Sequence, residues 1–266
     1  NFFQPVNQPK IPKNIVAQFA YALSGPIVLP RFGEGGPSVW NGKNKLFFFT
    51  DLERTTQRNT AGTTRTIPPL SLRPDANGNV SFVGTGTTIF DPASNPDPRK
   101  RTPFPGNVIP AGRIDIAALE LIRQLPAPTG PGSTNNFAST GTGEFNRTNV
   151  DVKINYVGTE LSLWGRYSRS PTNIFDPPIF GIIGGGALNG GQLGTAPGLV
   201  QVVGFGGTYT FSPTVILDAN IGYTRQRLGA ENIDLDQPYG LSVLKIPGTN
   251  GPDRLQNGYP FFNITG

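Results

Sequence analysis

Three pairs of carboxylates have the residue types and spacing that come closest to a chemical site. They are Asp51 with Glu53, Asp91 with Asp97, and Asp234 with Asp236. A glycosidase needs two carboxylates at a defined separation, one with a pKa raised by burial, and calcium needs oxygen ligands at binding-loop spacing. Spacing along the chain establishes neither arrangement. We interpret the pairs as solvated loop carboxylates or, for Asp51 and Glu53, as residues on the polar face of a strand.

The missing residue types exclude further kinds of active site. The 266-residue chain has no His, no Cys and no Met. These absences exclude a Ser-His-Asp triad, a cysteine nucleophile, a His or Cys zinc site and a haem ligated by His, Met or Cys. The glycine-rich segment 181–191 lacks the Lys-Ser/Thr of a phosphate-binding loop. We therefore expect no enzymatic activity, no cofactor and no metal site.

Composition and charge describe a loop-rich chain that does not bind nucleic acid. The chain holds 35 Gly and 27 Pro, well above average usage, while 36% of its residues are still hydrophobic. Its net charge is +5, but the basic residues are scattered and only 15% of residues are charged. Nucleic-acid binders concentrate basic residues on one face. No apolar run is long enough for a transmembrane helix, although barrel strands would leave a weaker signal.

Six segments alternate with the period of two that is typical of strands. Their connections alternate between tight turns, at 158–159 and 212–214, and long loops. Short turns on one side and long loops on the other are the pattern of outer-membrane barrels. The sequence therefore predicts an all-β fold, an antiparallel transmembrane β-barrel fragment. Its strands are predicted at 15–24, 45–58, 148–157, 160–169, 199–211 and 215–225, and its long loops at 59–147, 170–198 and 228–266.

The alternation also assigns residues to two faces of each strand. The polar face is predicted to line the barrel lumen and carries Asn149, Asp151, Lys153, Asn155, Ser162, Arg166, Asp218, Asn220 and Thr224. The apolar face is predicted to meet lipid and carries Val150, Val152, Ile154, Leu161, Leu163, Tyr167, Leu217, Ile221 and Tyr223. Outside the strands, residues 115–125 predict one helix with Asp115 as its N-cap and Pro126 after its end.

A soluble β-sandwich alternates in the same way, although its strands are usually shorter and its loops more even. In that case the chain would be a β-rich adhesin or filament subunit at the cell surface or outside the cell. The two readings differ in whether the apolar faces meet lipid or a second sheet. A third reading, a secreted carbohydrate-active enzyme, would require two carboxylates that converge in one cleft.

A series of short motifs runs along nearly the whole chain. The motifs are Asn1-Phe2-Phe3 and the segments 18–30, 43–49, 89–93, 101–110, 113–115, 126–128, 164–168 and 246–252. Each motif carries little information alone, but their order is fairly specific. In this order they resemble the early barrel of Oar-like TonB-dependent outer-membrane receptors, which are large receptors with an N-terminal carboxypeptidase-regulatory-like domain.

The resemblance implies a partial barrel, similar to the 22-stranded transporters whose lumen is plugged. The plug, the TonB-contacting segment and the regulatory-like domain would then lie upstream of Asn1, and further strands beyond Gly266. The implied function is capture of an unidentified ligand on extracellular loops and its import with TonB-derived energy. The implied partners are outer-membrane lipid and the TonB complex, and the implied location is the bacterial outer membrane.

Overall fold

The computed structural model describes residues 13–30, 39–191 and 193–262 of the chain. The motif at Asn1 to Phe3 lies outside the described residues. The chain forms two compact units. The strand unit comprises residues 1–60, 142–175 and 195–231, and the loop unit comprises residues 61–141, 176–194 and 232–266.

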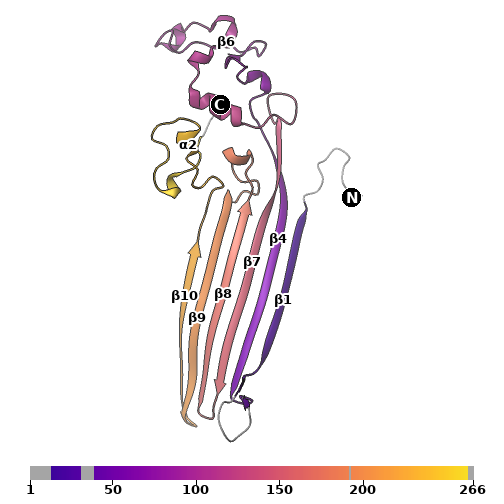
Figure 1. Cartoon of the computed structure of the whole chain (residues 1–266), viewed down its shortest axis with the longest axis vertical. Helices are drawn as coiled ribbons and strands as arrows, with labels where there is room; N and C mark the ends of the chain where they lie inside the picture. Colours follow the sequence, from indigo (N-terminus) through magenta and orange to yellow (C-terminus); the bar gives the residue numbers. More distant parts are fainter. Residues whose placement is uncertain (1–12, 31–38, 192, 263–266) are drawn as a thin grey trace, which may run out of the picture. The chain divides into compact units, whose positions relative to one another are not determined.

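A six-stranded sheet dominates the structure, with the strand order β1-β4-β7-β8-β9-β10 (Figure 1). The pairs β1/β4, β7/β8 and β9/β10 are antiparallel. This is the all-β, antiparallel fold of six long strands that the sequence predicts. The strands are β1 (Asn14–Pro26), β4 (Leu46–Arg65), β7 (Phe137–Val157), β8 (Leu161–Asp176), β9 (Gly194–Ser212) and β10 (Val215–Leu228).

Two tight turns join neighbouring strands at one end of the sheet. β9 and β10 are joined through Pro213 and Thr214 alone. β7 and β8 are joined through residues 158–160, where the Gly158 N–H donates to the carbonyl of Leu161 at 2.8 Å. A Cβ at Gly158 would lie 2.9 Å from that same carbonyl oxygen, so the close approach of the backbone requires glycine here.

Several strands extend beyond their predicted ends. β4 continues to Arg65 instead of residue 58, β7 begins at Phe137 instead of residue 148, and β8 continues to Asp176. The long loops predicted at 59–147 and 170–198 are therefore shorter in the structure. The added residues are rich in Thr, Asn, Ser and Gly on both faces, so hydropathy loses its period of two while the backbone ladder continues.

Two short hairpins supplement the main sheet. One pairs β2 (Val28–Pro30) with β3 (Val39–Asn41), and the other pairs β5 (Val80–Ser81) with β6 (Val108–Ile109). Strands of two or three residues are too short to cover a face of the main sheet. The sandwich reading would need a second long sheet on the apolar face, and the residues described here form none.

The loop unit contains the helices of the described chain. The predicted helix is confirmed as α1 (Ile116–Gln124), with the Asp115 carboxylate accepting from the N–H groups of Ala117 and Ala118. None of the described helices is long and apolar enough to cross a membrane. The others are η1 (Leu70–Leu72), η2 (Pro98–Lys100), η3 (Pro105–Asn107), η4 (Ala111–Arg113), η5 (Gly181–Ile183), α2 (Tyr239–Ser242) and η6 (Arg254–Gln256).

A small core holds the loop unit together. Ile67, Phe137 and Ile179 are buried against one another, and the rings of Phe137 and Phe180 lie 5.5 Å apart. Beside them, the fully buried Asn136 side chain accepts from the Ile67 N–H and donates to the Ile67 carbonyl, each at 2.9 Å. Because a buried amide must find such partners, this pair fixes the chain on both sides of the long 66–136 connection.

Candidate functional site

The two faces of the main sheet differ in chemistry, and the polar face is the first candidate site. On it, Nη2 of Arg166 lies 2.5 Å from Oδ1 of Asp151, and the Ser168 hydroxyl donates to the same carboxylate. The ammonium of Lys153 stands 5.5 Å from the centre of the Trp164 ring. Arg166 on β8 and Asp151 on β7 therefore neutralise each other across adjacent strands, and Lys153 lies over the face of an aromatic ring.

A second ion pair adds to this network. Nη2 of Arg147 on β7 lies 2.9 Å from Oε1 of Glu53 on β4. Asp151, Arg166 and Glu53 from these pairs lie along a shallow groove of about 610 Å³, whose lining holds three carboxylates and two cations. The groove is lined in part by Ala20, Ala22, Asp51, Glu53, Asp151, Lys153, Trp164 and Arg166.

The remaining residues predicted for the polar face lie on β7, β8 and β10. The Ser170 hydroxyl lies 2.5 Å from Oδ1 of Asn149, and the Thr208 hydroxyl donates to Asp218 at 2.7 Å. The structure thus brings Asp151, Lys153 and Arg166 together, and sets the β10 residues along a separate edge strand. The cross-strand neighbours of the others are Trp164 for Asn155, Val157 for Ser162, Gly206 for Asn220 and Val202 for Thr224.

Trp164 is a functional candidate that is missing from the residues predicted to line the lumen. It lies on the polar face, where a Cβ on Gly206 would come within 2.7 Å of the indole. The same ring is in contact range of Gly204. Two glycines on β9 thus leave room for the indole. The sequence signal was available, since Trp164 shares the even-numbered positions with Arg166.

The apolar face carries the residues predicted to meet lipid, and most of them are exposed. Cross-strand pairs on it join Val152 to Tyr167, Tyr156 to Leu163, and Ile221 to Phe205. Of its large side chains, Leu217, Ile221 and Tyr223 are 52%, 74% and 65% exposed, whereas Val150 and Leu161 are half-buried. A contiguous exposed apolar surface of this kind marks an interaction with membrane or with a partner. The assignment of one face to lumen and the other to lipid stays a prediction.

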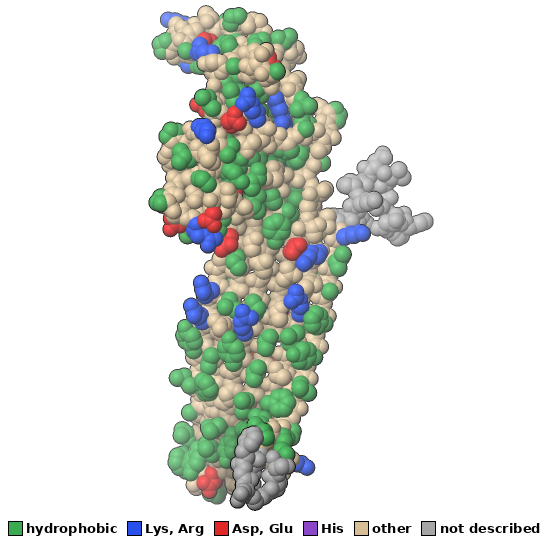
Figure 2. Space-filling view, viewed as in Figure 1, with side chains coloured by type: hydrophobic (Ala, Val, Ile, Leu, Met, Phe, Trp, Pro, Cys, Tyr) green, Lys and Arg blue, Asp and Glu red, His purple; other side chains and the backbone are tan. Residues whose placement is uncertain are grey.

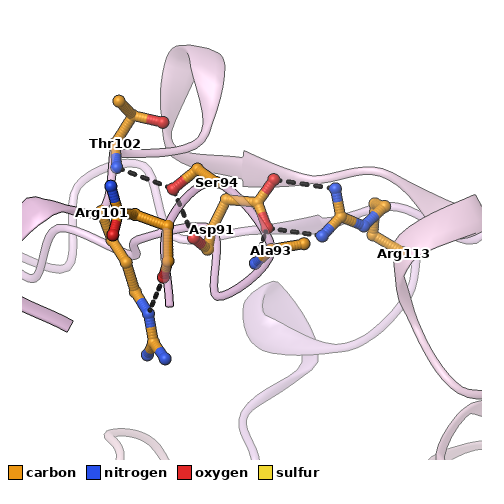
Figure 3. Close-up of polar contacts among 7 residues, drawn as sticks. Asp91, Ala93, Ser94, Arg101, Thr102 and Arg113 are labelled. Atoms are coloured by element: carbon orange, nitrogen blue, oxygen red, sulfur yellow. Dashed lines mark hydrogen bonds and ion pairs between the residues drawn. The ribbon is translucent and has the colours of Figure 1, made fainter. Parts of the chain in front are cut away.

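The acidic pairs of the loops serve local structure. Figure 3 shows the Asp91 carboxylate facing the forked guanidinium of Arg113, with Oδ2 to Nη1 at 2.8 Å. This hydrogen-bonded partner holds the pKa of Asp91 below its usual range. Asp97 caps η2 through the Arg99 N–H, and the buried Asp234 carboxylate accepts from the Tyr259 N–H at 2.6 Å. Within residues 13–30, 39–191 and 193–262, no three metal-ligating side chains cluster.

Comparison with known proteins agrees with this geometry. The family model described as outer membrane beta barrel domain matches residues 1–266, the whole length of the sequence. No curated protein and no solved structure matches the chain. Long antiparallel strands with an apolar face, tight turns at one end and long connections at the other are the features of such barrels. The chain belongs to the outer membrane beta barrel domain family, and its location is the bacterial outer membrane.

Proposed function

We propose that this barrel domain is part of a TonB-dependent receptor that captures a ligand on its loops and imports it through the lumen. The observation that carries the proposal is the ion pairing on the polar face. Arg166 pairs with Asp151, and Arg147 pairs with Glu53. A wettable wall on which opposite charges lie side by side suits a lumen filled by a removable plug, because paired charges attract the plug and the ligand less strongly than unpaired ones.

The loop unit supports the capture step of this proposal. It is braced internally, because Arg73 donates to the carbonyls of Leu125 at 2.8 Å and Pro126 at 2.6 Å. The rings of Tyr239 and Tyr259 stack at 4.7 Å between centres. Preorganised loops lose less conformational entropy when a ligand binds, which raises affinity. The resemblance to Oar-like receptors points in the same direction.

Energy coupling is tested first with a probe that needs no knowledge of the ligand. The full-length protein is purified in detergent and titrated with the isolated periplasmic domain of TonB from the same bacterium. We expect saturable binding that a mutant lacking the residues upstream of this barrel loses. Absence of binding by the full-length protein would overturn the TonB-dependent proposal.

Transport is tested separately in cells. Strains that lack either the receptor or TonB are grown in the same complex medium, and the compounds remaining in the medium are measured by mass spectrometry. We expect both strains to leave behind the same compound that wild-type cells remove. If neither strain differs from wild type in uptake, and the receptor deletion instead abolishes attachment of cells to surfaces, the adhesin reading replaces the import reading.

A further inference from the structure

The apolar face of the sheet ends in arginines on three of its strands. Arg54 on β4 follows Leu52 by two positions, and therefore lies on the same face. Arg169 on β8 follows Tyr167 in the same way. On β10, Tyr223 is followed on this face by Arg225 and then Arg227. On both β8 and β10, a tyrosine of the apolar face is thus followed on that face by an arginine. We call each of these changes a Tyr–Arg step.

Cross-strand contacts align the Tyr167–Arg169 step on β8 with the Tyr223–Arg225 step on β10. Arg225 stands opposite Gln201 on β9, and Tyr223 stands opposite Val203. The Gln201 amide donates to the Tyr167 hydroxyl on β8 at 2.9 Å. Gln201 therefore connects the Tyr167–Arg169 step to the Tyr223–Arg225 step. Tyr167 and Tyr223 therefore lie on the two strands that flank β9, and arginines border them in a row across the sheet. This arginine row consists of Arg54, Arg169, Arg225 and Arg227.

These arginines pair with none of the carboxylates in residues 13–30, 39–191 and 193–262. All four are exposed, and none of the ion pairs within the described part of the chain includes them. By contrast, Arg58, four positions beyond Arg54 on β4, pairs with Glu144 at 3.3 Å. Figure 2 shows Lys and Arg side chains crossing the strands at mid-length, beyond the apolar side chains that gather toward the turns. The row therefore presents unneutralised positive charge.

The depth of the apolar band places this row at a membrane interface. On β10 the outward residues from Val215 to Tyr223 span about 27 Å along the strand at ~3.4 Å per residue. At a strand tilt of ~40° this corresponds to about 20 Å of depth, close to the ~25 Å apolar band of outer-membrane barrels. The apolar band of β10 ends at Tyr223, and Arg225 is the next residue on the same face. The long connections lie on the same side, which is the extracellular side in such barrels.

An apolar groove lies next to the row. The Phe205 ring packs over Gly165 on β8, at 3.2 Å from where a Cβ would lie. A groove of about 450 Å³ is lined there by Val152, Ile154, Leu163, Tyr167 and Phe205 among others. Tyr167 lies both at this groove and beside the arginine row. A molecule with an anionic head and an apolar chain therefore meets complementary surface at both of its ends.

We propose that Arg169 and Arg225, flanked by Arg54 and Arg227, bind the phosphate groups of lipids in the outer leaflet around the barrel. Guanidinium groups bind phosphate through two parallel N–H donors. The tyrosines mark the interface, and the groove at Gly165 takes an acyl chain of the same lipid. The ligand class is a lipid with a phosphomonoester head, held at the outward face of β8 to β10.

The test uses the full-length protein in detergent, titrated with phosphatidic acid, with phosphatidylcholine or with inorganic phosphate, and bound lipid is measured by native mass spectrometry. We expect phosphatidic acid to be retained in preference to phosphatidylcholine. The double substitution Arg169→Gln/Arg225→Gln is expected to weaken this retention about tenfold, equivalent to about 1.4 kcal/mol. Added salt is expected to weaken it as well, because exposed charges are screened.

Two control variants separate an effect at the arginine row from a general loss of charge and from misfolding. Arg99→Gln/Lys100→Gln removes the same charge from exposed positions on η2 and is expected to leave retention unchanged. Arg169→Lys/Arg225→Lys keeps the charge and is expected to retain most of the binding, which separates loss of charge from misfolding. The proposal is overturned if Arg169→Gln/Arg225→Gln retains phosphatidic acid like wild type. It is also overturned if inorganic phosphate displaces the lipid at equal concentration, because the row would then bind free phosphate.

Discussion

Nη2 of Arg147 lies 2.9 Å from Oε1 of Glu53, although the two residues are 94 positions apart in the sequence. The pair joins β7 to β4 across the connection that contains α1 and most of the loop unit. Its side chains are 39% and 28% exposed, so water screens the attraction only partly. The pair therefore supports the alignment of β4 with β7, together with the Arg58–Glu144 pair and the Asn136–Ile67 contact at the ends of the long connection.

Removal of this pair is expected to weaken the barrel measurably. A double-mutant cycle of Glu53→Gln and Arg147→Gln should give a coupling energy of about 1 kcal/mol in unfolding from lipid vesicles. The matched control is Glu120 with Arg123 on α1, a more exposed pair at 2.7 Å and three positions apart. Helical pairs of that kind contribute only about 0.2–0.5 kcal/mol. Equal coupling in both cycles would contradict a special role for the strand pair.

The space between Trp164 and β9 gives a second prediction. A Cβ on Gly206 would lie 2.7 Å from the indole, so Gly206→Ala must displace a large ring from the polar face. We expect a loss of about 1–3 kcal/mol in the free energy of unfolding. Gly222→Ala is the control, since its new methyl group would meet only the Val203 carbonyl, at 3.6 Å. The two substitutions should differ clearly in urea unfolding of the full-length protein, and equal losses would contradict the packing of Trp164 against Gly206.

The sequence was sufficient to predict the strands where one face is apolar. Val152, Ile154 and Tyr156 alternate with charged and amide residues, and this period of two determined both the strand and its faces. α1 was predictable for a similar reason, because Asp115 and Pro126 mark its ends.

Other features depend on cross-strand neighbours that no local pattern contains. The polar extension of β4 has hydroxyl and amide residues on both faces, and only pairing such as that of Thr60 with Thr142 reveals it as strand. The meeting of Glu53 with Arg147 depends on the register between β4 and β7. The step from Tyr167 to Arg169 is visible in the sequence, but its alignment with Tyr223 and Arg225 is a property of the sheet.

The assignment of faces is tested by placing a charge on each of them. Leu217 lies on the apolar face opposite Tyr209, and Asn220 lies on the polar face opposite Gly206. An arginine that faces lipid costs about 2–4 kcal/mol at mid-depth and less toward the interfaces. We therefore expect Leu217→Arg to block assembly into the outer membrane and Asn220→Arg to be tolerated. Assembly of the full-length protein is measured by protease protection in cells, and equal tolerance of both changes would contradict the face assignment.

The ion pair between Asp91 and Arg113 makes the loop unit sensitive to acid. Arg113 lowers the pKa of Asp91 in the folded state, so the stabilisation is fully present above the ordinary carboxyl pKa and is lost as pH falls through the folded value. Hydrogen exchange of residues 91–113, corrected for intrinsic rates, should therefore stay slow from neutral pH to about pH 5 and accelerate below about pH 4.

Asp91→Asn should remove this pH dependence and give fast exchange throughout, because an amide cannot form the charged pair with Arg113. Asp97→Asn is the matched control, since an asparagine side chain still accepts the capping hydrogen bond from the Arg99 N–H. The control should keep the wild-type acid transition in residues 91–113. If Asp91→Asn also keeps that transition, the acid sensitivity arises from another carboxylate and the pair with Arg113 does not stabilise these loops.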